Sequence, residues 1–184
     1  MPPGFHDLFL ASAGVAGSLI GLLFVAVSIA HDRLTAEKEA QVSRVRASAA
    51  LTAFLNAFSV SLFVLVPGVG AGWPAFIVAL TGLLFIAGAL LSLVRVRRTE
   101  PGGIRDAVFL LGLVVTFAIQ LVSGLRAIEH PHATGPVQAI AILVIVCFLI
   151  GIARSWELIG GPDIGLISEL RAIAGSRAKK PNLR

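Results

Sequence analysis

The residues best suited to bind a metal ion are histidines and carboxylates that lie beside two long apolar segments. His6 precedes the first of these segments, and Glu129, His130 and His132 follow the fourth. Imidazole and carboxylate groups are ligands that zinc and copper accept, and the proline between His130 and His132 stiffens their turn. The sequence therefore indicates a candidate metal site. The alternative is a set of solvated turn residues, because an H-x-H spacing is a weak signal.

Uncharged polar side chains recur near the middle of the apolar segments. On two of these segments they are spaced three and four residues apart, which places them on one helical face. At about 1.5 Å of rise per residue, the most central ones fall within roughly 5 Å of the midpoints of their segments. We name this set the polar belt, and its members are Ser18, Asn56, Ser59, Thr81, Thr116, Gln120 and Ser123.

Two functions are open for the polar belt. Amides that face lipid would leave donors and acceptors unpaired, so Asn56 and Gln120 must face protein or water. Hydroxyls and amides can line a pathway, where they replace part of the hydration shell of a permeating species. They can equally join helices by hydrogen bonds, and no charged residue lies at this depth to relay protons or bind ions.

The first apolar segment carries small residues along one side of its helix. Gly14, Ser18 and Gly21 recur at intervals of four and three, and Gly17 forms a GxxxG pair with Gly21. Helices in lipid associate through close backbone approach, which small side chains permit, so this face is expected to touch another helix. That helix belongs either to the same bundle or to a second subunit.

The elements that must position these residues are five segments without Lys, Arg, Asp or Glu. Hydrophobic residues are 57% of the 184 and charged residues 14%, and the mean hydropathy of +0.92 is far above that of soluble domains. Each segment is close to the ~20 residues that a bilayer core requires. The fifth is apolar all round apart from Cys147, which predicts that it faces lipid. The sequence predicts an all-α integral membrane protein, with a bundle of five transmembrane helices in residues 1–155, at about 8–30, 48–66, 74–94, 107–125 and 137–153.

The basic residues predict the orientation. All Lys and Arg except Arg126 lie after the first segment, after the third, or after the fifth, in the basic stretch that begins at Arg154. By the positive-inside rule, the N-terminus is outside and the C-terminus is cytoplasmic. Residues 156–184 form a basic cytoplasmic tail with a short amphipathic segment, so we expect binding to anionic lipid, and the net charge of +5 needs no nucleic-acid partner. The lipid-binding candidates are Arg95, Arg97, Arg98, Arg177, Lys179 and Lys180.

No sequence motif points to an enzyme or a cofactor. The chain lacks H-E-x-x-H, G-x-S-x-G and C-x-x-C, and no histidine lies at mid-segment, where a haem would need a ligand. A bias toward Ala, Gly, Val and Arg suggests a bacterial source, and so a multi-pass protein of the cytoplasmic (inner) membrane. We expect a homo-oligomeric, non-enzymatic protein without a cofactor, a channel or transporter-like pore lined by the polar belt. The alternative is an accessory or signalling subunit that binds an unknown membrane protein through the small-residue face of the first helix.

Overall fold

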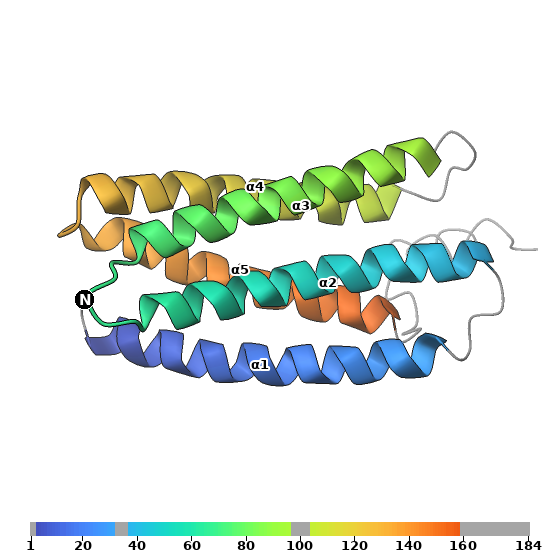
Figure 1. The fold of residues 1–184 in the computed structure, drawn as a ribbon, viewed down its shortest axis with the longest axis horizontal. Helices are drawn as coiled ribbons and strands as arrows, with labels where there is room; N and C mark the ends of the chain where they lie inside the picture. The colour runs from blue at the N-terminus through green and yellow to red at the C-terminus, as the bar shows by residue number, and fades with distance from the viewer. Residues whose placement is uncertain (1–2, 32–36, 97–103, 159–184) are drawn as a thin grey trace, which may run out of the picture.

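The computed structural model describes residues 3–31, 37–96 and 104–158, and in these ranges the chain forms five α-helices and no strand (Figure 1). The all-helical class expected from the sequence is confirmed, and each expected apolar segment corresponds to one helix. The helices are α1 (Pro3–His31), α2 (Glu37–Val64), α3 (Gly72–Val96), α4 (Ile104–Glu129) and α5 (Thr134–Leu158).

Four of the described helices are long and apolar enough to cross a membrane, which indicates a membrane protein. Their apolar stretches are Gly4–Ile29, Arg46–Val64, Val108–Glu129 and Thr134–Leu158. The described part of α3 holds a shorter apolar stretch, Gly72–Gly88. These lengths match the ~20 apolar residues that span a bilayer core of about 30 Å.

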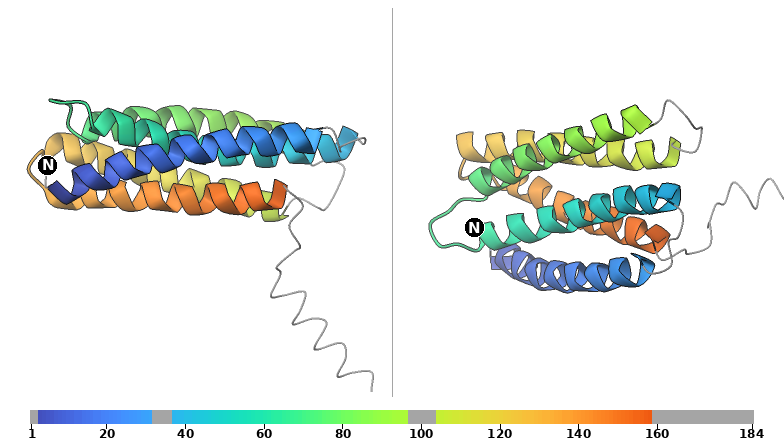
Figure 2. Two further views of the ribbon diagram at one scale, coloured as in Figure 1. Left: turned by 90° about the horizontal axis from the view of Figure 1, so that it is seen from below. Right: turned by 45° about the vertical axis from the view of Figure 1, so that its right-hand side comes forward.

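Successive helices run in alternate directions and contact one another along the bundle (Figures 1 and 2). The start of α1, the α2–α3 connection and the α4–α5 turn lie at one end, which we call the N-terminal end of the bundle. The α2–α3 connection contains Gly68 at a φ of +80°, a backbone conformation that glycine adopts without steric cost. The chain therefore reverses direction there without a long loop.

α5 packs against α1, α2 and α4. Its buried residues include Ile140, Val144 and Cys147, whereas Ile142 and Leu149 are exposed on its other side. The prediction that this helix faces lipid is therefore wrong for one of its faces. Its composition could not distinguish the two environments, because a protein interior and lipid tails are equally apolar.

Glycine allows the helices to approach closely at two contacts within the bundle. Between α3 and α4, a Cβ atom at Gly124 would lie 2.8 Å from the backbone nitrogen of Phe76 and 3.0 Å from the carbonyl oxygen of Gly72. Between α2 and α5, a Cβ atom at Gly151 would overlap the ring of Phe54. At Gly124 the neighbouring atoms are backbone, so a larger residue requires the helices to move, whereas at Gly151 the ring of Phe54 would have to shift. α2 adds a row of buried alanines, Ala49, Ala50, Ala53 and Ala57.

Part of the predicted lipid-binding set lies outside the described residues, namely Arg97, Arg98, Arg177, Lys179 and Lys180, as does the tail from residue 159 onward. Arg95 lies in the last turn of α3, where the helical backbone alone is described. α5 ends at Leu158, just past the domain boundary expected at residue 155.

Candidate functional site

Two amide side chains of the polar belt bind each other in the interior of the bundle. Asn56 on α2 donates from Nδ2 to Oε1 of Gln120 on α4 at 2.9 Å, and Gln120 Nε2 donates back to Asn56 Oδ1 at 3.0 Å. The residues are 3% and 0% exposed, so neither amide faces lipid. We call these two residues the amide pair. It satisfies the requirement that buried amides have partners.

The amide pair also reaches the two remaining neighbouring helices. Asn56 Nδ2 lies 3.2 Å from Sγ of Cys147 on α5, and Gln120 Nε2 donates to the carbonyl oxygen of Ala75 on α3 at 3.3 Å. Each amide nitrogen carries two hydrogens and each has two acceptors here. The pair therefore joins α2, α3, α4 and α5 with every amide N–H used.

Three hydroxyls of the polar belt, those of Ser18, Thr81 and Thr116, bond within their own helices. Thr116 donates to the carbonyl oxygen of Gly112 at 2.8 Å, and Thr81 donates to that of Ile77 at 2.9 Å. Ser18 on α1 does the same, and both Ser18 and Thr81 lie on the exposed surface of the bundle. Thr116 and Ser123 are buried, and Ser59 is half-buried. Of the seven residues of the belt, the structure brings together Asn56 and Gln120 by side-chain hydrogen bonds.

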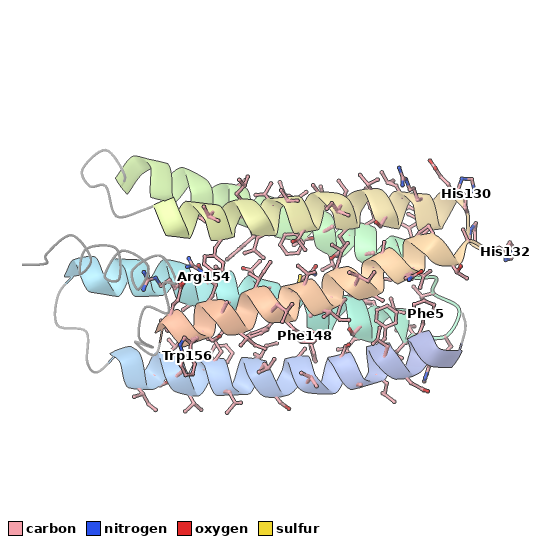
Figure 3. The ribbon with its side chains drawn as sticks, turned by 180° about the vertical axis from the view of Figure 1, so that it is seen from behind. Phe5, His130, His132, Phe148, Arg154 and Trp156 are labelled. Carbon is pink, nitrogen blue, oxygen red and sulfur yellow. The ribbon has the colours of Figure 1, made fainter. Side chains whose placement is uncertain are left out.

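The predicted metal site is not formed. His6, Glu129, His130 and His132 all lie in the described part of the chain, which contains no group of three or more His, Cys, Asp or Glu that could hold a metal ion. His6 instead has its Nδ1 3.5 Å from the carboxylate of Asp7. His130 and His132 lie on the turn that joins α4 to α5 (Figure 3). Proximity at one end of the bundle therefore does not bring three donors of the described residues to one point.

The small residues of α1 face away from the bundle. Gly14, Ser18 and Gly21 are exposed, and a Cβ atom added at either glycine would meet nothing within 4 Å. Gly17 lies to the side, where its Cβ would contact the ring of Phe58 on α2 at 3.7 Å. The hydroxyls of this side are already bonded, since Ser18 and Ser28 each donate to a carbonyl oxygen of α1. The sequence left two possible partners for this face, a helix of the same bundle or one of a second subunit. Within the described residues, no helix of the same bundle packs against Gly14 or Gly21. We call Gly14, Ser18, Gly21 and Ser28 the α1 face.

A buried charged cluster, which the sequence did not predict, lies at the opposite end of the bundle. Arg154 on α5 is fully buried, and its guanidinium lies over the ring of Phe109 on α4, 4.5 Å from the centroid. It donates to Oε2 of Glu157, which lies 3.9 Å from Nε of Arg46 on α2. Sequence reasoning counted Arg154 with the basic tail. The i, i+3 spacing of Arg154 and Glu157 was the available signal, since such pairs meet on a helix.

Comparison with known protein families, with curated proteins and with solved structures finds no match to this chain. The proposals below therefore rest on its own residues.

Proposed function

We propose that this chain is a multi-pass membrane protein that assembles inside the bilayer, and that it binds a partner helix through the α1 face. The partner is a second copy of the same chain, which makes the protein a homo-oligomer. Its biochemical role is then that of a membrane-embedded assembly or accessory subunit. Charge asymmetry supports an outside N-terminus and a cytoplasmic C-terminus, and composition supports the inner membrane of a bacterium.

The observation that carries this proposal is the contrast between two kinds of glycine. Gly124 and Gly151 lie against neighbouring helices, so close packing within the bundle accounts for glycine at both positions. Gly14 and Gly21 are of the same residue type at helical spacing, yet nothing of the described chain touches them. Lipid does not require glycine on a helix surface, whereas a closely approaching second helix does. The α1 face therefore has the features of a helix contact whose partner is missing from one chain.

The position of α1 in the bundle supports the same proposal. In its apolar stretch 28% of the residues are buried, compared with 33 to 50% in the other three helices that are long enough to cross a membrane. α1 contacts α2 and α5, which leaves the opposite side of the helix open. Because its hydroxyls bond to its own backbone, the α1 face offers no unpaired donor to lipid and can pack against a flat helix surface.

A channel or transporter, the other function that the sequence predicts, receives less support from the geometry. The amide pair uses all of its N–H groups on the protein itself, so it has none to offer a permeating species. Ser18 and Thr81 lie on the outer surface of two different helices. A pathway lined by Ser18 and Thr81 would have to run between copies of the chain. Flux measurements in liposomes with ions and small solutes would detect it.

The experiment that tests the assembly proposal is the particle mass of the purified protein in a mild detergent, by light scattering. We expect an oligomer for the wild type and a monomer for Gly21→Leu, because the leucine side chain would hold two α1 helices apart. Gly88→Leu is the matched control, since Gly88 is an exposed glycine of α3 whose Cβ would also meet nothing within 4 Å. An equal mass for the two variants would contradict the proposal. The wild type could also be a monomer whose particle mass increases only when a second membrane protein co-purifies with it. The partner of the α1 face would then be that protein and not a second copy of the chain.

A further inference from the structure

The N-terminal end of the bundle contains a hollow of about 680 Å³ that the proposed function does not use. Three separate parts of the chain form it: His6 on α1, the segment 64–71 that leads from α2 to α3, and the segment 131–134 that leads into α5. Binding sites for small molecules are clefts of roughly 300–1,000 Å³, so the hollow has the size of a ligand site.

The walls of the hollow combine apolar and polar surface in similar shares. Val64, Leu65 and Val137 contribute aliphatic surface, and His6, His132 and Thr134 contribute two imidazoles and a hydroxyl. No Asp, Glu, Lys or Arg is found among the described residues that line it. A ligand that fits this surface has an apolar body and one polar group that accepts hydrogen bonds.

Hydrogen-bond donors at the hollow favour an oxyanion as the acceptor. His6 also lies beside a carboxylate, since its Nδ1 is 3.5 Å from that of Asp7, so Nε2 of His6 is the atom left for the ligand. An imidazole N–H donates well to an oxyanion, and a hydrogen bond to a charged acceptor is about twice as strong as one between neutral groups. α3 and α5 both begin beside the hollow, and neither has an acidic residue in its first turn. Their first N–H groups add partial positive charge on the same side. Two imidazoles are too few donors for a protein-bound metal ion, in line with the absence of a three-ligand group among the described residues.

We propose that this hollow binds an amphiphile with an oxyanion head group, a carboxylate or a phosphate, and an apolar body. His6 and His132 hold the head group, and the aliphatic wall holds the body. The site lies at an end of the bundle, where transmembrane helices meet water, so such a molecule can come from the aqueous phase or from the lipid leaflet. The proposal is independent of the α1 face, because one chain forms the whole hollow.

The test uses Trp73 as a reporter. This tryptophan lies in the first turn of α3, beside the lining segment that ends at Ala71, and its side chain is exposed. The chain has two tryptophans, so Trp156→Phe leaves Trp73 as the single emitter. The Trp156→Phe protein in micelles of a non-ionic maltoside detergent, which carries no phosphate or carboxylate, is titrated with octanoate, and with octan-1-ol as the uncharged control. Parallel micelles contain increasing fractions of phosphatidylglycerol, which tests the lipid as the source of the head group.

A saturable change in Trp73 emission is expected with octanoate or with phosphatidylglycerol, and not with octan-1-ol. His6→Ala and His132→Ala should each raise the half-saturating concentration about tenfold, as the loss of one charge-assisted hydrogen bond does. His130→Ala is the matched control, because this histidine lies in the same turn and does not line the hollow. It should change the half-saturating concentration less than about twofold. Gly70→Phe, placed where an added Cβ meets nothing within 4 Å, should fill the hollow and abolish the response.

Three results would overturn the proposal. One is the absence of a saturable response to both octanoate and phosphatidylglycerol. Another is an equal effect of His132→Ala and His130→Ala. The third is a saturable response to zinc chloride alone that requires His6 and His132, which would assign the hollow to a metal ion. Because both lining histidines are exposed, their alanine variants are expected to fold, and the particle mass is measured on the same samples so that a failure of assembly is recognised separately.

Discussion

At the scale of single residues, the amide pair explains how two strongly polar side chains lie in the interior of an apolar bundle. Asn56 and Gln120 exchange two hydrogen bonds, and their remaining N–H groups reach Cys147 and Ala75. Buried polar groups are tolerated when each finds a partner, and here four helices supply them. The sequence could place the two amides at one depth, because helical rise is regular. It could not show that they bind each other, because it does not fix how α2 and α4 are rotated.

The amide pair should contribute to stability as one unit. We expect Asn56→Leu and Gln120→Leu each to lower the free energy of unfolding by about 1 kcal/mol, in the range of hydrogen bonds between membrane helices. The double variant should lose less free energy of unfolding than the two single variants lose together, because neither leucine leaves an unpaired amide behind. Unfolding of the detergent-solubilised protein, followed by circular dichroism, measures these changes. Thr81→Val is the control, since Thr81 is exposed and bonds within its own helix. Fully additive losses would contradict the coupling.

At the scale of the helices, the sequence predicts where they lie far better than what each face of them contacts. Long apolar segments locate the helices, because a bilayer sets their length. The prediction that α5 faces lipid missed its buried side, and Gly124 and Gly151 were not recognised as contact points. In a soluble protein an apolar stripe marks the buried side, but lipid and the bundle interior are equally apolar. Gly14 and Gly151 look alike in the sequence, and only the arrangement of the helices shows that one is open and the other closed in.

Replacement of glycine by alanine is expected to lower the stability where the glycine contacts another helix, and not where the glycine is exposed. Gly124→Ala should destabilise the protein by roughly 1–3 kcal/mol, because its methyl group would press on the backbone of α3. Gly88→Ala should be neutral or slightly stabilising, since its methyl group meets open space and alanine is the better helix former. Thermal unfolding of both variants in the same detergent compares them. A Gly124→Ala protein as stable as Gly88→Ala would mean that α3 and α4 are less close than described.

At the scale of the whole molecule, the two ends of the bundle differ from each other, and the α1 face is open along the side. The hollow lies at the N-terminal end, the buried cluster of Arg46, Arg154 and Glu157 at the other, and the α1 face along the side. Eight of the fifteen Lys and Arg, whose distribution predicts the orientation, lie outside the described ranges. The orientation is therefore a prediction from the sequence alone, and the alternate directions of the five described helices agree with the connectivity that it needs.

Cysteine labelling in intact cells tests the orientation. In a Cys147→Ser background, which removes the single cysteine of the chain, we expect Gly70→Cys and Thr134→Cys to react with a membrane-impermeant maleimide from outside. Thr99→Cys, at a position outside the described residues, should react only after the cells are opened. Reaction of Thr99→Cys in intact cells would overturn the five-span orientation.

Oxidative cross-linking in native membranes tests the central claim, that the α1 face meets a second copy of the chain. A disulfide needs Cα atoms roughly 4.4–6.8 Å apart, so it forms between helices only where their backbones approach closely. In the Cys147→Ser background, single cysteines at Gly14, Ser18 or Gly21 should give covalent dimers on mild oxidation. Leu84→Cys on α3 and Leu111→Cys on α4, at positions 69% and 62% exposed, should remain monomeric. Dimers at Leu84 or Leu111, with none along the α1 face, would contradict the account.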